Sequence, residues 1–591
     1  MIYTLEMKMM NNNIYKVFAL ALFAGLSLTS CNDFLDKLPD ERSEIKTESD
    51  VQELLMTAYP DANFAWVAEL SSDNLLDNQC PHLPSNPNKK QIITYYNYGS
   101  YDRWDDEMFK FEEAKSATFS SYDSPGTLWA GYYASIASVN YCLQALDAVK
   151  EENNGQETAK GKALRAEAQI LRAWNHFCLV NLFSQTYKTE AVSKNDVGVT
   201  YMTTPETQSK VEYQRGNVWD TYQSIKKDLE EALPNISDAY IGTYKYHFNT
   251  QAANAFAARF YLYTRDWEKV IKHANEVLGT DSASVAKMML DYTAFDDCSY
   301  LNDFSTVWQS PKQNNNLMLS VTGSLLQRRC FGYRYSLAGP KASEVMMVRS
   351  SSNLWKGYIC PIQALVGGML FSSSTKDYGF FSSKIGEEFE YSDKLAGIGY
   401  PHIIQRTFTA AELLLERAEA KLMIGDIEGG VQDLCWYWNS AYTHFSEKSK
   451  TTYANYWVDL TRTIIERSYT NTETRKYANC FDNWDFTQTV DPSYVVPAKI
   501  VPYMNCLNEF RRFENMFEGL RFFDLKRWGM PYEHEMGTDK QVFKMESNDV
   551  RRALEVPWET LSAGLESSRK VEGRAENMKY DTSSLQISTN N

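Results

Sequence analysis

A helical repeat of apolar side chains is the feature that most limits what this chain can fold into. In residues 162–183, apolar side chains recur every three or four positions, which places them on one face of an α-helix. Leu164, Ala168, Leu171, Cys178 and Leu182 form this stripe. Residues 129–146 and 218–233 show the same spacing, and Pro234 ends the second of these segments. The pattern predicts a mainly α fold.

Two further segments are typical of degenerate tetratricopeptide-like helix pairs. Residues 252–263 and 270–278 form the first pair, in which Ala258 allows two helices to approach closely. The second pair begins with the stripe at residues 411–422 and turns at Gly425. The two pairs lie about 160 residues apart, so a tandem array is excluded. A helical superstructure with long insertions describes the pattern better.

Residues 76–128 and 281–400 interrupt the helical pattern and form the predicted insertions. Both are rich in Asn, Ser, Gly, Tyr and Asp, and they contain short β-like runs at residues 91–96 and 318–322. Loops of this length inside a compact chain often carry function. The insertions are therefore the places where we look for binding residues.

The N-terminus has the order of features found in a bacterial lipoprotein leader. Lys8 and Lys16 precede twelve apolar or small residues, 17–28, which span about 18 Å as a helix and are too short to cross a bilayer. The run ends in Leu-Thr-Ser-Cys at residues 28–31, which resembles a lipobox. We expect a signal peptide at residues 1–30 and lipidation of Cys31. The alternative is a buried amphipathic N-terminus with an incidental cysteine.

Charge and motifs exclude several classes of function. The chain has 76 acidic and 60 basic side chains, a net charge of −16, which argues against a nucleic-acid partner. The histidines show no metal-binding spacing, no nucleophile elbow occurs, and residues 155–162 resemble a P-loop with the wrong spacing. No motif selects two carboxylates for a glycosidase, although 76 acids do not exclude such a pair. We expect no enzyme activity, cofactor or metal, and mostly free thiols.

Several blocks of the sequence resemble the SusD/RagB family of outer-membrane nutrient-uptake lipoproteins. The sharpest is residues 511–528, which contains Arg-Arg-Phe-Glu and then Glu-Gly-Leu-Arg-Phe-Phe-Asp-Leu-Lys-Arg-Trp. The others, in chain order, are residues 32–39, 69–74, 129–140, 166–173, 182–183, 228–234, 418–420 and 556–559. Residues 184–187 depart from the family's usual Gly-Asp-x-Pro, and a polar tail replaces its C-terminal motif.

The block at residues 511–528 also has a purely structural interpretation. Four of its charged side chains are spaced three or four apart and can pair along one helix face as a buried ion-pair network. They are Arg511, Glu514, Glu518 and Arg521. On this interpretation the block identifies the fold and not a ligand site.

The resemblance implies a SusD-like α-helical superstructure in a single domain, residues 51–566. A signal peptide at 1–30, a lipidated tether at 31–50 and a polar tail at 567–591 surround this domain. It further implies a lipid-anchored protein of the cell outer membrane, exposed at the cell surface. Such a protein binds glycan and acts as the lid of a SusC-like TonB-dependent transporter for nutrient import. The alternative is a RagB-type lid that binds oligopeptides.

Sugar rings present C–H faces that stack on flat aromatic rings, while polar side chains satisfy their hydroxyl groups. Residues 95–105 supply both kinds of side chain within eleven residues, and the second insertion adds further Trp residues. The candidate ligand-binding residues are Tyr98, Tyr101, Arg103, Trp104, Trp308 and Trp355. The alternative for each ring is that it packs its loop onto the helices.

Overall fold

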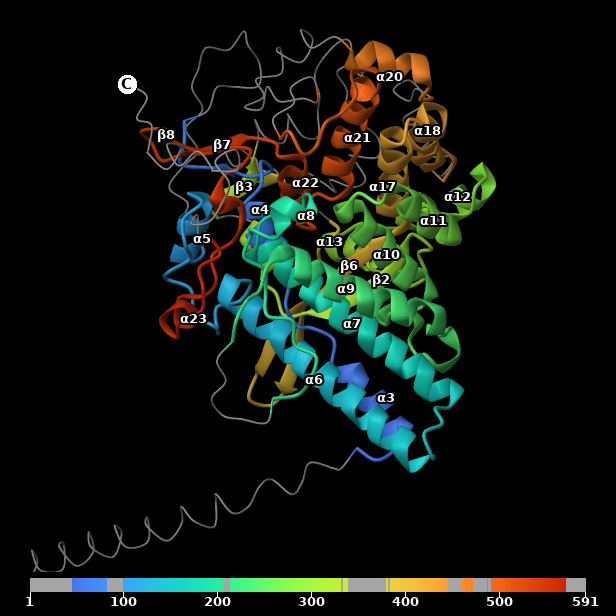
Figure 1. The fold of residues 1–591 in the computed structure, drawn as a ribbon. Coiled ribbons are helices and arrows are strands. Elements are labelled where there is room, and N and C mark those ends of the chain that lie inside the picture. Colours follow the sequence, from blue (N-terminus) through green and yellow to red (C-terminus); the bar gives the residue numbers. More distant parts are fainter. Residues whose placement is uncertain are drawn as a thin grey trace, which may run out of the picture.

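The computed structural model describes residues 45–81, 99–206, 213–330, 333–338, 379–380, 383–444, 459–470, 486 and 491–569. Helices dominate this part of the chain (Figure 1). The helices are α3 (Glu48–Thr57), α4 (Ala65–Leu70), α5 (Arg103–Phe109), α6 (Pro125–Glu152), α7 (Ala159–Phe183), α8 (Glu190–Ser193), α9 (Val218–Ala232), α10 (Thr250–Thr264), α11 (Trp267–Leu278), α12 (Ser282–Met288), α13 (Leu301–Trp308), α14 (Leu326–Cys330), α17 (Ala410–Met423), α18 (Ile427–Thr443), α20 (Arg462–Tyr469), α21 (Val501–Glu514), α22 (Leu520–Trp528) and α23 (Trp558–Ser562). The strands are β1 (Leu76–Asp77), β2 (Asn316–Thr322), β3 (Tyr335–Ala338), β4 (Gly379–Phe380), β5 (Glu387–Asp393), β6 (Ile398–Thr409), β7 (Tyr532–Met536) and β8 (Gln541–Met545).

The predicted helical stripes become the long helices α6, α7 and α9, and the prediction of a mainly α fold is confirmed. Each helix begins at a side chain that accepts a hydrogen bond from a backbone amide of the first turn. Ser124, Thr158 and Asn217 do this for α6, α7 and α9 at 3.2, 2.9 and 2.8 Å. The caps place the helix starts up to four residues before the predicted segments.

The two predicted helix pairs are α10–α11 and α17–α18, and they lie side by side although the insertion separates them in sequence. Helix α11 packs against α17, and α21 packs against the other side of α17. Gly430 allows α17 and α18 to approach, because a Cβ there would lie 2.6 Å from Leu422 Cγ. The two pairs thus pack against each other, and α12 and β2 of the insertion pack on them.

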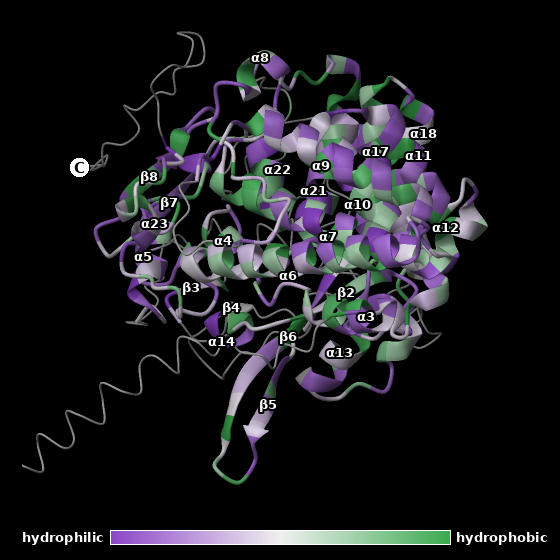
Figure 2. Ribbon diagram, turned by 60° about the horizontal axis from the view of Figure 1, so that its bottom comes forward, coloured by the Kyte–Doolittle hydropathy of each residue, from purple (hydrophilic) through white to green (hydrophobic). Residues whose placement is uncertain are grey.

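Three small antiparallel sheets lie against the helices. Their strand orders are β1-β3-β4, β2-β6-β5 and β7-β8. The β-like run at residues 318–322 is confirmed as part of β2, whereas the run at residues 91–96 lies outside the described residues. Strand β5 and the outer half of β6 form a hairpin that projects from the body of the protein (Figure 2).

The family-like blocks near the two ends of the chain bind each other. Arg521 of α22 forms a two-pronged pair with Asp73, at 2.7 and 2.8 Å. The Gly519 amide donates to Glu69 at 3.1 Å, and Arg512 donates to the Asp73 carbonyl at 2.8 Å. All four side chains of this contact are buried or nearly so. These contacts join α22 and the end of α21 to the segment that follows α4.

The predicted pairing along one helix face within residues 511–521 is wrong, although the network is buried. The four charged side chains concerned are Arg511, Glu514, Glu518 and Arg521. Helix α21 ends at Glu514, and Phe517 and Gly519 adopt φ of +61° and +78°, so the chain turns. Arg511 consequently pairs with Asp524 at 2.8 Å, and Glu518 with Arg406 at 2.8 Å. Glu514 accepts from the Tyr437 hydroxyl at 2.9 Å.

Packing contacts continue past residue 566, the predicted end of the domain. The Ser568 amide donates to Glu555 Oε1 at 2.8 Å, and Arg569 Nε donates to the Ala553 carbonyl at 3.1 Å. Residues 567–569 thus pack on the domain. Within the described ranges, the cysteines are free thiols, and no helix is both long and apolar enough to cross a membrane.

Candidate functional site

The sequence-predicted binding residues divide into three groups. Cys31, Tyr98 and Trp355 lie outside the described residues. Trp104 and Trp308 are buried in the core, 2% and 0% exposed. Tyr101 and Arg103 lie near the surface at the start of α5, and the candidate site is built around these two residues.

The start of α5 is fixed by a reciprocal cap. The Asp102 amide donates to the Asp105 carboxylate at 2.9 Å, and the Asp105 amide donates in return to the Asp102 carbonyl at 3.2 Å. This cap directs Trp104 into the core and leaves Arg103 on the outside, with a side chain that is 85% exposed. Tyr101 precedes the cap and lies partly exposed.

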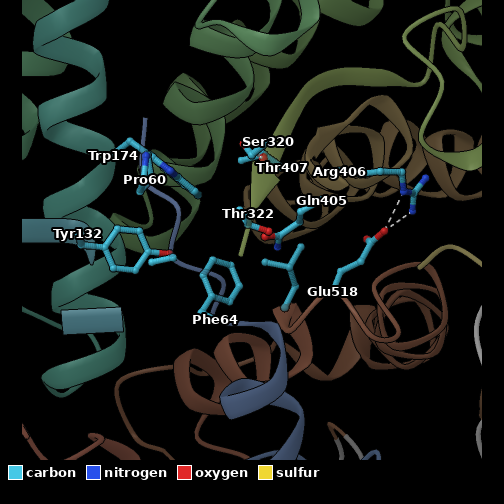
Figure 3. A pocket seen from close by; sticks show the side chains of 12 residues that line it. Pro60, Phe64, Tyr132, Trp174, Ser320, Thr322, Gln405, Arg406, Thr407 and Glu518 are labelled. Atoms are coloured by element: carbon cyan, nitrogen blue, oxygen red, sulfur yellow. Dashed lines mark hydrogen bonds and ion pairs between the residues drawn. The ribbon is translucent and has the colours of Figure 1, made fainter. Parts of the chain in front are cut away.

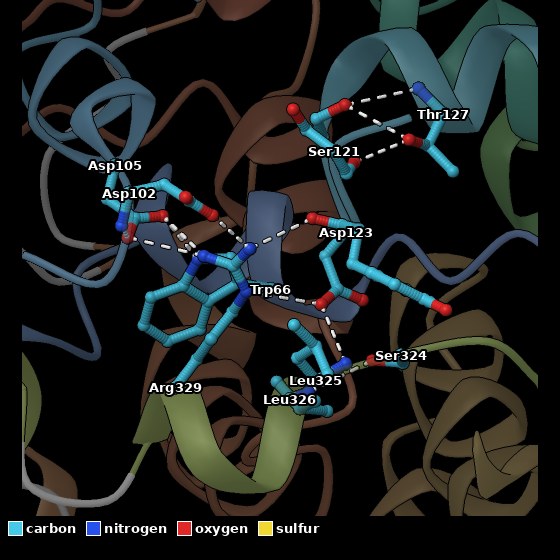
Figure 4. Close-up of polar contacts among 12 residues, drawn as sticks. Trp66, Asp102, Asp105, Ser121, Asp123, Thr127, Ser324, Leu325, Leu326 and Arg329 are labelled. Carbon is cyan, nitrogen blue, oxygen red and sulfur yellow. Dashed lines mark hydrogen bonds and ion pairs between the residues drawn. The ribbon is translucent and has the colours of Figure 1, made fainter. Parts of the chain in front are cut away.

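A buried arginine of α14 contacts both the start of α5 and the loop before α6 (Figure 4). The Arg329 side chain is fully buried and contacts Asp102, Asp105 and Asp123 at 2.6, 3.1 and 3.2 Å. It also donates to the Tyr122 carbonyl at 3.0 Å. Burial raises the pKa of Asp105 to about 6, although Arg329 opposes that rise. One side chain thus ties α5, α14 and the loop before α6 into a rigid base.

Two aromatic rings lie on this base. The Tyr101 and Tyr333 rings meet edge to face with centroids 4.9 Å apart, and both side chains are partly exposed. The Arg329 guanidinium lies 4.6 Å from the Tyr101 ring centroid and 4.8 Å from that of Trp104. We call Tyr101, Arg103, Arg328 and Tyr333 the aromatic corner. A ring fixed by a buried charge presents its free area without a large entropy cost on binding.

Arg328 connects the aromatic corner to the projecting hairpin. Its guanidinium donates to the Glu387 carboxylate at the start of β5, with Nε at 2.8 and 3.0 Å from the two oxygens. Hydrogen bonding to Glu387, and then to the Tyr101 hydroxyl, raises the pKa of Arg328. The Arg328 side chain remains 45% exposed, so it can still donate to a ligand hydroxyl.

The structure changes our expectation for Trp104 and Trp308. The Trp308 ring lies under the Arg406 guanidinium, at 4.8 Å, and its Nε1 donates to Ser383 at 3.3 Å. A sugar cannot stack on either indole without removing the layer above it. Both rings therefore act as core residues, and we no longer expect them to contact ligand.

A small polar cavity lies between α7, β2, β6 and α22 (Figure 3). Its lining includes Thr322, Gln405, Arg406 and Glu518, and its volume is about 20 Å³. That space admits a water molecule and excludes a sugar ring. The cavity therefore belongs to the buried polar network and not to a ligand site.

A larger pocket, about 280 Å³, lies between α6 and the chain at residues 200–206. Trp129, Met202 and Leu565 make much of its wall apolar. Two polar lining residues already donate to neighbouring carbonyls: Tyr133 to Thr200 at 3.1 Å, and Asn140 to Met202 at 3.2 Å. The same wall contains Thr560, whose buried hydroxyl has no hydrogen-bond partner among the residues that the structure describes. In the described part of the chain, no group of His, Cys, Asp and Glu side chains could hold a metal ion.

Sequence reasoning missed Tyr333 and Arg328, which complete the aromatic corner, and the exposed rings Phe389 and Tyr391 on β5. Tyr333 comes from a different insertion than Tyr101, and nothing in the sequence pairs them. Residues 388–391 read Glu-Phe-Glu-Tyr, an alternation typical of a strand with one aromatic face. That alternation could have indicated the hairpin.

Comparison with known proteins agrees with the predicted family. Residues 33–262 match a SusD-like family described as "Starch-binding associating with outer membrane". A SusD superfamily protein from Bacteroides thetaiotaomicron is similar in structure, with a TM-score of 0.56 and 14% identity over 88% of this chain and 99% of that one. A putative sugar-binding protein from Bacteroides vulgatus has a TM-score of 0.52 and 16% identity over 89% of this chain and 98% of that one. A SusD-like protein from Bacteroides fragilis has a TM-score of 0.51 and 16% identity over 89% of this chain and 98% of that one. No curated protein matches the chain in sequence.

Proposed function

We propose that this chain, which resembles SusD-like proteins over residues 33–262 and in its fold, binds glycan at the bacterial outer membrane without cleaving it. The family match covers residues 33–262, and the fold of the whole described chain agrees with it. The aromatic corner is the observation in the structure that supports glycan binding. It offers partly exposed rings on a rigid base, with guanidinium groups beside them.

The chemistry of the aromatic corner suits a neutral sugar. The Tyr101 and Tyr333 rings offer area to C–H faces of a pyranose. Arg103 and Arg328 can donate to hydroxyl groups, and Arg328 does so while held by Glu387. The carboxylates of the base face Arg329 in the buried network and are engaged there. A binding role therefore needs no catalytic pair.

We further propose that the protein is a surface lipoprotein that serves as the lid of a SusC-like TonB-dependent barrel. Lipidation of Cys31 would leave residues 32–47 as a tether before α3, whose cap is Thr47. A tether of that length holds the lid close to its transporter and raises the effective concentration of the two surfaces. Delivery of glycan into the barrel would then follow from opening and closing of the lid.

Binding of defined polysaccharides tests the glycan proposal. We expect the protein to be retarded in native gels that contain at least one of amylopectin, arabinoxylan and galactomannan. Tyr101→Ala should weaken that binding about two- to tenfold, because a stacked ring contributes about 0.5–1.5 kcal/mol. Tyr141→Ala is the matched control, because Tyr141 is an exposed tyrosine of α6 that does not belong to the aromatic corner.

Two results would contradict the proposal. Binding to none of the three polysaccharides, together with micromolar binding to a mixed oligopeptide library, would favour the peptide-binding alternative. Release of reducing sugar from any of the polysaccharides would show an enzyme. Co-purification with a TonB-dependent barrel encoded beside its gene tests the transporter partner separately.

A further inference from the structure

The hairpin β5–β6 exposes a pair of aromatic rings that no contact of the fold requires. The Phe389 and Tyr391 side chains are 43% and 51% exposed, and their rings meet edge to face with centroids 5.0 Å apart. The hairpin projects from the body of the protein, so these rings lie away from the core (Figure 2). Exposed apolar area of this kind usually marks a binding surface.

Strand geometry places the two rings on one face together with the ion pair of the aromatic corner. Successive side chains of a strand point to opposite faces, and the register with β6 is regular from Glu387 to Tyr391. Glu387, Phe389 and Tyr391 therefore share a face. Because Glu387 binds Arg328, which belongs to the aromatic corner, this face continues from the aromatic corner.

A glycine opposite the rings fixes the position of Phe389. Gly399 pairs with Tyr391 across the hairpin, and a Cβ there would lie 2.7 Å from the Phe389 ring. It would also lie 2.0 Å from the Glu390 carbonyl oxygen. Any larger residue would push the ring off the strand. The glycine thus lets the ring lie flat against the backbone, with its outer side free.

Charge on the hairpin limits what this face can bind. Residues 387–398 contain Glu387, Glu388, Glu390 and Asp393 against Lys394. Glu388 and Glu390 alternate onto the opposite face of β5, and Glu387, which shares the face of the two rings, is paired with Arg328. The stretch from Glu387 to Tyr391 therefore presents no uncompensated charge beside the rings. A face without excess positive charge does not attract an anionic glycan or an anionic lipid headgroup. A neutral chain is the occupant that matches both the rings and the charge.

We propose that the Phe389–Tyr391 face is a second binding subsite that extends the aromatic corner along one neutral polysaccharide chain. This inference rests on the proposed glycan binding and adds a place and a substrate class to it. A glycan long enough to leave the corner contacts the hairpin face next, whereas a short oligosaccharide fills the corner alone. The protein thus selects for chain length.

The test compares two double variants of the full chain. Phe389→Ala with Tyr391→Ala removes the proposed subsite. Ile398→Ala with Tyr400→Ala is the matched control, because these two exposed side chains alternate onto the opposite face of the same hairpin. All four side chains are exposed, so both variants should melt within a few degrees of the native chain. Calorimetry measures affinity for amylopectin, arabinoxylan, galactomannan and hyaluronan, and for trisaccharides of the neutral polymer bound best.

We expect the first variant to lose roughly tenfold affinity for the neutral polymer and less than about twofold for its trisaccharide. The control variant should stay within about twofold for both. Equal affinity of the first variant and the native chain for the polymer overturns the subsite alone and leaves the proposed function standing. An equal loss in the control variant, or tighter binding of hyaluronan than of any neutral polymer, also overturns the subsite. Failure of the native chain to bind any polymer overturns the proposed function and the subsite with it.

Discussion

Removal of the guanidinium beneath the aromatic corner should cost more stability than any change at the corner's surface. Arg329→Met keeps much of the side-chain volume but leaves Asp105 and Asp123 buried without their cation, at 1% and 0% side-chain exposure. Breaking a buried ion pair from one side costs about 3–5 kcal/mol. With an unfolding entropy of about 2.1 cal/mol/K per residue, a domain of roughly 500 residues should melt about 3–5 °C lower.

The stability lost in Arg329→Met should increase as the pH rises. Burial raises the pKa of Asp105 to about 6 and raises that of Asp123, while Arg329 opposes both shifts. A carboxyl group with a folded-state pKa above its unfolded value destabilises the fold as the pH rises towards that folded pKa. Without Arg329 this penalty grows and extends to higher pH. The variant should therefore lose most stability at pH 8 and clearly less at pH 5.

Differential scanning calorimetry at pH 5 and pH 8 measures the loss of stability and its dependence on pH. Arg103→Met is the control, because the Arg103 side chain is exposed and lies 3.9 Å from its partner Glu107. Surface pairs of this kind contribute at most about 0.5 kcal/mol, so the control should melt like the native chain. A loss below about 1 kcal/mol at pH 8, or an equal loss at both pH values, would refute the argument from buried charge.

Three further predictions follow from features of the fold. Gly519→Ala should destabilise the protein by more than about 1 kcal/mol beyond Gly397→Ala, since both have positive φ but only the Gly519 Cβ would clash, 2.8 Å from Ala65 Cα; equal losses in urea unfolding would contradict this. Glu69→Gln should reduce the loss of stability between pH 5 and pH 8 by up to about 3 kcal/mol, because burial raises the pKa of Glu69 to about 7; melting curves with an unchanged pH slope would oppose it. Arg521→Met should cost about 3 kcal/mol, the low end for a broken buried ion pair, because the buried Asp73 carboxylate keeps only its longer contact with Arg512 at 3.5 Å; a midpoint in urea within error of the native value would disprove it.

Much of the helical architecture was predictable because helix formation depends on local spacing. The stripe at residues 162–183 appears as α7 almost unchanged, with its start set by Thr158. The contact between α11 and α17 was not predictable, since an apolar stripe identifies a buried face but not the face that it meets. The pairing of Arg511 failed for a related reason: the positive φ at Gly519 breaks the helix on which the spacing depended.

The candidate site was predictable only in its location. The amino-acid composition shows that residues 95–105 are rich in aromatic side chains. It does not show which of these side chains points into the core. The cap at Asp102 settles that choice, because it sends Trp104 into the core and leaves Tyr101 near the surface. Tyr333, whose ring contacts that of Tyr101, lies in an insertion more than two hundred residues later in the chain. No local sequence pattern encodes such a contact.

The pairing of Asp73 with Arg521 determines when the nascent chain can complete its fold. The two residues are 448 positions apart, and at about 5–20 residues per second the ribosome needs roughly 20–90 s to synthesise the second after the first. During that interval Asp73 and Glu69 cannot be buried without a large energetic penalty, so the surrounding segment has to stay hydrated. We expect a chain truncated before α22 to leave this segment exposed, and limited proteolysis measures that exposure. Residue 521 therefore has to be present before the segment around Asp73 can be buried.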